Sequence, residues 1–345
     1  MKILAIQFKY LGDAVLLTPA LRALRKQFPG AELHLLVPEE IAPILRHLPW
    51  FDRVWPMPRR RGSASPGKTW PIIRALRRER FDCSVDFASN DRGAILSLLI
   101  GAKKRLGWNE RGGFLGRRFC YNQHVAPETT EQHESARMMR LLSAWDIASD
   151  SLEPEIRSDP ALDAAAEKLL PMRAILCHIA SSQPNRQWPV RLWAEFNQLA
   201  AAAGLPIVFT TASGTREGAL TDELKKLLEQ TGKMPVPLIL PAVPELALFL
   251  AVLKRAEVFI SGDTGPLHFA AGLGVPTLSL FGPSSPVRWA PVGKLHRMLK
   301  GSPCPCGPGV SVCLSANDCL AAITPGQVLD SLQSILKSAR QSPGL

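Results

Sequence analysis

The chain has 345 residues, 46% of them hydrophobic and 21% charged, which is typical of a globular protein of about two domains and excludes a disordered or fibrous one. No apolar stretch approaches the roughly 20 residues that span a bilayer, since even VPTLSLFG and AILSLLIG are soon interrupted. The N-terminal MKILAIQFKYLGD lacks the small-residue cleavage site of a secretory signal. We therefore interpret it as a first strand and expect a cytoplasmic protein.

The net charge of +11 is concentrated in one third of the chain. Residues 53–118 contain 16 Lys and Arg against 5 Asp and Glu, which accounts for the whole excess. The densest runs are RRRGSASPGK and RRERF. Such a region can attract phosphate-bearing partners or an anionic membrane surface. A solvated charge run with no partner fits the composition equally well.

The first half of the chain alternates between short apolar runs and segments of helical period. We expect strands at residues 2–8, 31–37, 52–57, 82–87 and 104–108, and helices at 20–28, 39–48 and 69–81. Thr18 is expected to cap the first helix, with Pro19 as its first residue, because proline lacks the amide that would be unpaired there. This alternation predicts one doubly wound α/β unit.

The second half repeats the alternation after a polar, proline-punctuated stretch, residues 148–168, which we interpret as a linker and a short helix. We expect strands at 174–180, 206–211, 236–240, 257–261 and 276–281, and helices at 190–202, 216–230, 244–255 and 324–339. The predicted division is a domain at 1–160, a second at 171–323, and a helix and tail at 324–345. Two such units facing each other across a cleft would bind ligand at the carboxyl ends of their strands.

The segment SGDTGPLHFAAG follows the predicted strand 257–261 and opens a helix. Thr264 and Gly265 therefore fall at a helix N-terminus, where unpaired N–H groups favour an anion such as phosphate. Asp263, at the end of the strand, can accept hydrogen bonds from hydroxyls or from the turn. His268 can donate to a phosphate oxygen, although a lone histidine more often has a structural role.

Three segments together resemble one known family, in the right order and over nearly the whole chain: FKYLGDAVLLTPALRALRKQFP, HIASSQPNRQWP and SGDTGPLHFAAGLGVPTLSLFGPSSPVRWAP. They resemble the heptosyltransferases, glycosyltransferase family 9. The resemblance implies the GT-B architecture, with the acceptor on an N-terminal Rossmann-like domain and the nucleotide sugar on a C-terminal one. It also implies inverting transfer of heptose from ADP-L-glycero-β-D-manno-heptose to a lipopolysaccharide core or similar glycolipid on the cytoplasmic face of the inner membrane.

The resemblance also implies roles for residues of the first segment. Asp13 matches the base that deprotonates the acceptor hydroxyl, and Gly12 gives the backbone room near the donor. A carboxylate at a helix N-terminus normally has a low pKa, so its basicity would depend on desolvation. A plain helix cap is the alternative role for Asp13.

The second and third segments match the family's donor-binding positions. Ser181, Ser182 and Arg186 correspond to two hydroxyl residues and a basic side chain that face the diphosphate. Fixed donors of this kind can stabilise the departing diphosphate, so we expect neither a metal nor a cofactor. The resemblance assigns the remaining donor contacts to Asp263, Thr264, Gly265 and His268, with Asp263 on sugar hydroxyls, and more loosely to Glu217 near the ribose.

The acceptor side departs from the family pattern. Many members have small hydroxyl residues just before the Gly-Asp pair, whereas this chain has Lys9 and Tyr10. Lys9 is therefore a candidate for binding an acceptor phosphate. We assign the same role to Arg59, Arg60 and Arg61, and the basic region could instead rest on an anionic leaflet.

Four cysteines lie in one loop near the C-terminus, Cys304, Cys306, Cys313 and Cys319. They could bind a structural zinc ion, but their spacing is not the usual paired C-x-x-C arrangement, and reduced buried thiols are the commoner state in the cytoplasm.

Three other functions stay open. A dinucleotide oxidoreductase would need a G-x-G-x-x-G after an opening strand, and neither half has one. A non-enzymatic binder of nucleic acid or membrane would explain the basic region but leave Asp13, Arg186 and Asp263 without a purpose, so we expect no nucleic-acid partner. Another GT-B enzyme, such as a nucleotide-sugar epimerase, would turn over an ADP- or UDP-sugar without an acceptor.

Overall fold

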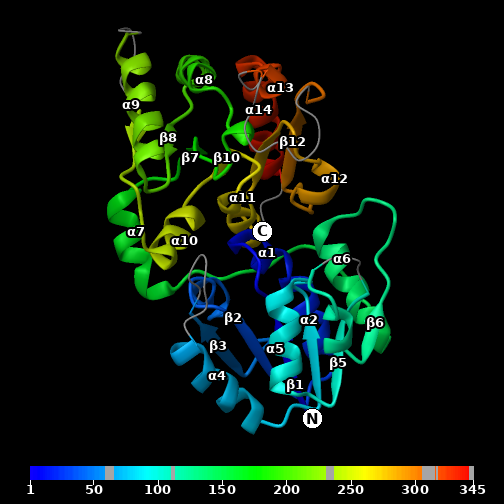
Figure 1. Cartoon of the computed structure of the whole chain (residues 1–345). Helices are drawn as coiled ribbons and strands as arrows, with labels where there is room; N and C mark the ends of the chain where they lie inside the picture. The colour runs from blue at the N-terminus through cyan, green and yellow to red at the C-terminus, as the bar shows by residue number, and fades with distance from the viewer. Residues whose placement is uncertain (59–65, 110–112, 231–236, 305–314, 316–317, 342–345) are drawn as a thin grey trace. The chain divides into compact units, whose positions relative to one another are not determined.

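The computed structural model of the chain describes residues 1–58, 66–109, 113–230, 237–304, 315 and 318–341. The chain divides into two compact units, residues 1–157 (the N-terminal unit) and residues 158–345 (the C-terminal unit) (Figure 1). Each unit is built on its own six-stranded sheet, in which the paired strands are parallel. The predicted class, two doubly wound α/β domains, is therefore confirmed. None of the described helices is long and apolar enough to cross a membrane.

The sheet of the N-terminal unit has the strand order β3-β2-β1-β4-β5-β6. Its strands are β1 (Lys2–Ile6), β2 (Glu32–Pro38), β3 (Arg53–Met57), β4 (Cys83–Asp86), β5 (Lys104–Trp108) and β6 (Gln123–Val125). Its α-helices are α1 (Leu11–Leu16), α2 (Thr18–Gln27), α3 (Ala42–Leu45), α4 (Pro66–Arg78), α5 (Asp91–Ile100) and α6 (Glu134–Leu141), and a 3₁₀ helix, η1, spans Arg117–Cys120. The order reverses between β1 and β4, so a ligand crevice is expected at their carboxyl ends.

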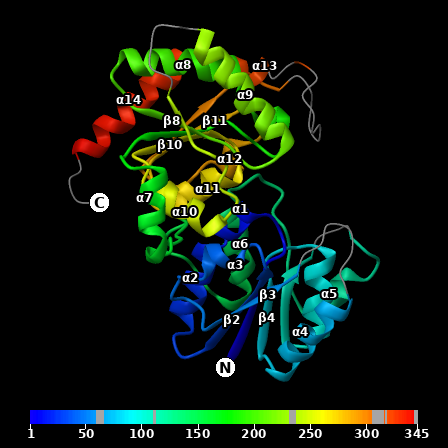
Figure 2. The same ribbon diagram turned by 90° about the vertical axis from the view of Figure 1, so that its left-hand side faces the viewer.

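Helices cover both faces of this sheet, with α4 and α5 on one side and α2 and α3 on the other (Figure 2). Ile6 and Phe8 lie in a core cluster with Ile73 and Leu76 of α4 and with Leu96 of α5. Burying apolar side chains of this size contributes about 1.5–3 kcal/mol each. The core thereby fixes the segment that leads out of β1 toward α1.

Two of the features expected in the N-terminal unit differ in the structure. Thr18 does not cap a helix: α1 already begins at Leu11, α2 follows with Leu17 at the N-cap, and Thr18 is the first helical residue of α2. Its hydroxyl donates to the Val15 carbonyl (2.7 Å) and accepts from the Glu155 amide (2.9 Å). The helix expected at residues 39–48 shrinks to the four residues of α3.

The sheet of the C-terminal unit has the order β12-β11-β10-β7-β8-β9, with the reversal between β7 and β10. Its strands are β7 (Ile175–His178), β8 (Ile207–Thr210), β9 (Leu238–Ile239), β10 (Val258–Gly262), β11 (Thr277–Phe281) and β12 (His296–Lys300). Its α-helices are α7 (Asp163–Leu169), α8 (Val190–Ala202), α9 (Thr215–Gln230), α10 (Leu246–Lys254), α11 (Gly265–Gly272), α12 (Pro286–Trp289), α13 (Asp318–Ala321) and α14 (Pro325–Gln341). Helix α14 packs beside α8 and so completes this unit.

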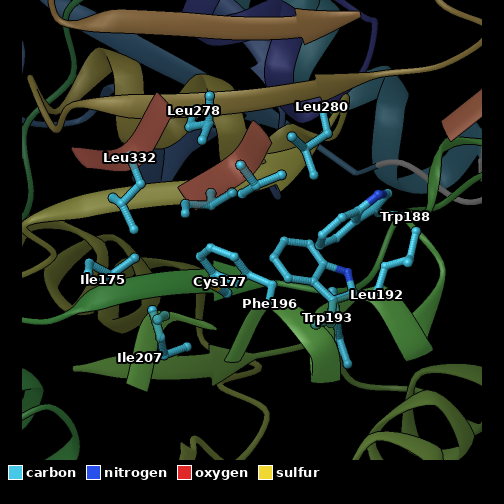
Figure 3. Packing of buried hydrophobic residues seen from close by; sticks show 14 of the residues in the cluster. Ile175, Cys177, Trp188, Leu192, Trp193, Phe196, Ile207, Leu278, Leu280 and Leu332 are labelled. Atoms are coloured by element: carbon cyan, nitrogen blue, oxygen red, sulfur yellow. The ribbon is translucent and has the colours of Figure 1, made fainter. Parts of the chain in front are cut away.

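Aromatic packing anchors the start of α8. Trp188 and Trp193 are fully buried, with ring centroids 4.8 Å apart in an edge-to-face arrangement. Phe196 packs edge-on to both rings in the same cluster (Figure 3). The Trp188 indole also donates to the Ile323 carbonyl at 3.0 Å. Such pairs contribute about 0.5–1.5 kcal/mol beyond area burial, so Trp188 fixes the end of the loop that runs from β7 to α8.

Candidate functional site

The expected donor residues gather at the carboxyl edge of the C-terminal sheet. Ser181 and Ser182 follow β7, and Asp263 follows β10 directly. Strands β7 and β10 pair in parallel, with His178 opposite Ser261, so their ends meet at the same edge. Ser181 and Asp263 are buried and Ser182 is exposed.

An ion pair joins the loop after β7 to the end of β10. The short 3₁₀ helix Pro184–Arg186 places the Arg186 Nη1 atom 2.7 Å from Asp263 Oδ2. The carboxylate side chain is only 4% exposed, whereas the guanidinium side chain is 29% exposed. The loop also passes so close to β10 that a Cβ on Gly262 would lie 2.3 Å from the Arg186 carbonyl oxygen. Glycine at position 262 therefore permits the approach that brings Arg186 and Asp263 together.

Glu217 reaches the same edge through a residue that the sequence analysis missed. Glu217 lies in the first turn of α9, just after β8. Arg216 donates to its carboxylate at 3.0 Å and also to the Ser181 carbonyl oxygen. Arg216 is thus a second cation at this edge, and its position directly before Glu217 in the sequence was the available signal.

The turn after β10 has the geometry expected of a helix start. Thr264 is the N-cap of α11 with an extended backbone, and Gly265 is the first residue of the helix. His268, one turn further, is buried, with its ring centroid 6.4 Å from that of Trp289. The structure therefore brings the Thr264–Gly265 amides to the edge that carries Asp263. Anion binding at these amides stays a prediction.

Asp13 is located in the first turn of α1, near the carboxyl end of β1. Its side chain is buried and accepts a hydrogen bond from the Tyr10 amide at 3.2 Å. Gly12 beside it is also buried. The capping role thus has direct geometric support, and it leaves the role as a base a prediction.

Lys9 pairs with an acid that the sequence analysis did not single out. Its Nζ atom lies 3.0 Å from Oε1 of Glu134, a fully buried residue in the first turn of α6. The Arg137 guanidinium lies 3.3 Å from the same oxygen. The Glu134 carboxylate therefore holds Lys9 at the carboxyl edge of the N-terminal sheet. An acceptor phosphate bound there would contact a Lys9 ammonium that is already paired with Glu134. Arg59, Arg60 and Arg61 lie outside the described residues.

Asp86 is a second buried acid at this edge, at the carboxyl end of β4 and opposite Ile6 of β1. Its carboxylate accepts from the Tyr121 hydroxyl at 2.6 Å and from the Ala88 amide at 2.9 Å. Two glycines leave room for the Asp86–Tyr121 pair. A Cβ on Gly93 would lie 2.4 Å from the Asp86 carboxylate, and a Cβ on Gly107 would lie 2.5 Å from the Tyr121 ring. Burial raises the pKa of Asp86 to about 6, although the Tyr121 hydrogen bond opposes the rise.

Removing the Tyr121 hydroxyl should therefore destabilise the protein in a pH-dependent way. Asp86 has an ordinary pKa of 3.8 and a folded-state value of about 6, so the stability linked to its protonation is present below pH 4 and is lost as the pH rises through 6. We expect Tyr121→Phe to lower the free energy of unfolding by about 1–3 kcal/mol at pH 7.5, where a buried carboxylate oxygen loses its donor, and by less at pH 4.5. Urea unfolding at both pH values measures this.

The control for this prediction is Thr129→Val, which removes the hydroxyl of an exposed residue. It should leave the unfolding free energy unchanged at both pH values. An equal loss for Tyr121→Phe at pH 4.5 and 7.5 would show that the hydrogen bond to the Asp86 carboxylate is not the cause.

The candidate metal ligands lie in two separate places in the chain. Of the four cysteines expected in one loop, Cys319 lies instead in helix α13 and is buried, and Cys304 is half-buried. Cys306 and Cys313 lie outside the described residues. Within the described part of the chain, one cluster has ligand-type spacing: Glu32, His34 and Glu79. The Lys2 ammonium occupies it, 3.2 Å from Glu32 and 2.6 Å from Glu79. This cluster is therefore an ion-pair network at the amino ends of the strands.

Comparison with known sequences identifies the family. The pattern of glycosyltransferase family 9 (heptosyltransferase) matches residues 69–315, more than half of the chain. The chain belongs to glycosyltransferase family 9. The resemblance expected from the sequence is thus confirmed, and the protein is a glycosyltransferase of the heptosyltransferase family.

Individual relatives are distant but match almost from end to end. Lipopolysaccharide heptosyltransferase 2 of Salmonella typhimurium is 23% identical over 361 aligned residues, which cover 97% of this chain and 99% of that protein. Lipopolysaccharide heptosyltransferase 1 of Pseudomonas aeruginosa is 27% identical over 321 residues, or 89% of this chain and 86% of that protein.

Solved structures share the fold of this family member. The structure of Escherichia coli ADP-heptose lipopolysaccharide heptosyltransferase II has a TM-score of 0.78 at 21% identity, covering 99% of this chain and all of that one. An E. coli heptosyltransferase with ADP-2-deoxy-2-fluoro heptose has a TM-score of 0.71 at 21% identity, covering 97% and 99% of the two chains. The GT-B-like fold implied by the sequence is therefore confirmed.

Proposed function

We propose that this glycosyltransferase moves heptose from ADP-L-glycero-β-D-manno-heptose to a lipopolysaccharide core or similar glycolipid acceptor, with inversion at the anomeric carbon, on the cytoplasmic face of the inner membrane. Family membership and the end-to-end match to lipopolysaccharide heptosyltransferases support the reaction class. The observation that carries the donor assignment is the Arg186–Asp263 ion pair beside the start of α11. These groups suit a nucleoside diphosphate sugar.

The C-terminal unit would bind the donor. A guanidinium carries five N–H donors in a rigid fork, so Arg186 can keep Asp263 and still bond a phosphate oxygen. The Thr264–Gly265 amides at the start of α11 add donors and a favourable helix dipole. Asp263 would accept from sugar hydroxyls, Ser181, Ser182 and His268 would add polar contacts, and Glu217, held by Arg216, would lie near the ribose.

The N-terminal unit would supply the base. In the proposed step the Asp13 carboxylate takes the proton of an acceptor hydroxyl as its oxygen bonds to the anomeric carbon. The bond between that carbon and the phosphate oxygen breaks on the opposite face, and ADP leaves with the electron pair. The charge that grows on the diphosphate would be stabilised by Arg186 and the α11 amides, which are fixed before the reaction. Lys9 and the basic residues 59–61 would bind anionic groups of the acceptor.

Calorimetric titration with ADP, UDP, GDP and NAD tests the donor assignment. We expect ADP to bind at least about tenfold more tightly than the other three, a difference of about 1.4 kcal/mol. Tighter binding of UDP would be consistent with the fold but would contradict heptose as the transferred sugar. Absence of binding to all four nucleotides would contradict the proposed function.

A further inference from the structure

The N-terminal unit exposes a group of large apolar side chains on neighbouring elements. Helix α5 lies beside both α4 and η1, and the adjacency of α4 and α5 is visible in Figures 1 and 2. The exposed side chains on these elements and on the residues just before η1 are Trp70 (51%), Ile95 (44%), Leu98 (47%), Phe114 (39%), Leu115 (103%) and Phe119 (68%). We call these six residues and the basic residues around them the apolar-basic surface.

Helix α5 is unusual because it is apolar on both faces. Leu96 and Ile100 lie in the core cluster under the helix. Ile95 and Leu98, three positions apart and therefore on one side of the helix, face outward. The outer face of a surface helix is normally polar. Exposed apolar side chains gathered on neighbouring elements are typical of a site of interaction.

Basic side chains surround these apolar ones. Helix α4 presents exposed Arg74, Arg77 and Arg78. Arg77 also donates to the Leu99 carbonyl at 2.9 Å, which ties α4 to α5. On the other side of α5, the Arg118 guanidinium lies 4.8 Å from the centre of the Phe119 ring. Exposed Lys103 and Lys104 follow α5, and Lys103 pairs with Asp82 at 2.8 Å.

The acids in these elements are few and paired. Glu79, directly after α4, lies 2.6 Å from Lys2 and 3.2 Å from Arg53. Asp91, at the start of α5, lies 3.6 Å from Arg117. The surface is therefore positive as well as apolar, which is the combination that an anionic lipid surface complements: apolar tips enter the acyl boundary while Lys and Arg contact lipid phosphates.

We infer that the apolar-basic surface is the face by which this enzyme rests on an anionic lipid bilayer. The inference deepens the proposed function, because a lipid-linked acceptor has to be reached at a membrane. It also fits the position of α5, which starts at Asp91, five residues after Asp86 at the carboxyl edge of β4. A bilayer under α4, α5 and η1 thus lies on the unit expected to bind the acceptor.

Vesicle flotation tests the apolar part of the surface. The full chain should float with vesicles that contain phosphatidylglycerol, bind at least tenfold more weakly to pure phosphatidylcholine, and be released by high salt. Leu115→Ser with Phe119→Ser should weaken binding to the anionic vesicles by tenfold or more. The matched control is Met172→Ser with Leu199→Ser, two exposed apolar residues of the C-terminal unit (61% and 41%), and it should bind as the wild type does.

Two double variants that remove positive charges distinguish the electrostatic part of the binding from the apolar part. Arg74→Gln with Arg78→Gln should weaken anionic-vesicle binding and flatten its salt dependence. Lys225→Gln with Lys226→Gln, two exposed lysines of α9, should have no effect. All four double variants should keep the wild-type affinity for ADP, which shows that they fold.

Three results would overturn the inference. The first is that the wild type does not float with anionic vesicles, and the second is that surface and control variants bind equally well. The third is that the wild type is a dimer, and that the Leu115/Phe119 variant is monomeric but binds vesicles as the wild type does. If the wild type did not bind ADP, that result would contradict the proposed function, but it would not affect the conclusion drawn from vesicle binding.

Discussion

Asp13→Asn is expected to lower kcat for heptose transfer by about 10²- to 10⁴-fold, the usual contribution of a positioned general base. The asparagine can still accept the Tyr10 amide hydrogen bond that Asp13 makes at 3.2 Å, so α1 should keep its start. Loss of the charge at the helix N-terminus should lower the free energy of unfolding by no more than about 1 kcal/mol. Steady-state kinetics with the donor and a lipopolysaccharide core acceptor measure the change.

Two controls show whether a loss of kcat in Asp13→Asn reflects the loss of the base. ADP affinity should be unchanged, because the donor contacts are assigned to the C-terminal unit. Asp163→Asn alters an exposed acid in the first turn of α7 and should leave kcat within about twofold of the wild type. If Asp13→Asn retained full kcat, Asp13 would be a helix cap and nothing more.

Arg186→Ala is expected to reduce kcat by about 10²- to 10³-fold and to weaken ADP binding at least tenfold. It removes a donor from the growing charge of the leaving diphosphate. It also leaves the Asp263 carboxylate, 4% exposed, without the guanidinium that lies 2.7 Å away. An unpaired buried carboxylate next to a diphosphate would repel it.

A double-mutant cycle separates the two effects. Adding Asp263→Asn to Arg186→Ala should restore part of the ADP affinity, so the double variant should lose less than the sum of the single variants by a coupling of about 0.5–3 kcal/mol. Arg191→Ala, at an exposed arginine of α8, should change neither kcat nor ADP affinity. Additive losses in the cycle would mean that the ion pair has no part in donor binding.

Most of the fold could be predicted because its strands are short apolar runs between helical repeats. The central strands β1, β4, β7 and β10 are buried along almost their whole length, and β1, β7 and β10 appear in the sequence as largely hydrophobic segments. Two strands that were not predicted lack this signal. Strand β6 has three residues, QHV, and the outer strand β12 is HRMLK, which is mostly polar and partly exposed.

The candidate donor site was more predictable than the acceptor side. A strand, a turn and a helix follow one another within the segment that contains Asp263, so local pattern alone places it at a sheet edge. The buried acids of the N-terminal unit depend on tertiary contacts instead. Glu134 is 125 residues from Lys9 in the chain, and Tyr121 is 35 residues from Asp86. Asp86 itself, at the end of a predicted strand, could have been noticed.

The basic region shows the same limit. Its excess charge is evident in the sequence, and the two alternatives for it, a partner surface or a solvated run, could not be separated there. In our proposal the exposure of Ile95 and Leu98 favours a partner surface. Their exposure depends on which face of α5 packs against the sheet. A run such as AILSLLIG does not disclose that face, because apolar residues occupy both sides.

Heptose transfer is tested by mass spectrometry of a heptose-deficient lipopolysaccharide core acceptor that has been incubated with the wild-type enzyme and ADP-heptose. We expect the acceptor to gain one heptose residue, ADP to be released in equal amount, and Asp13→Asn to give neither product within the same time. Transfer from a UDP- or GDP-sugar with no transfer from ADP-heptose would contradict it.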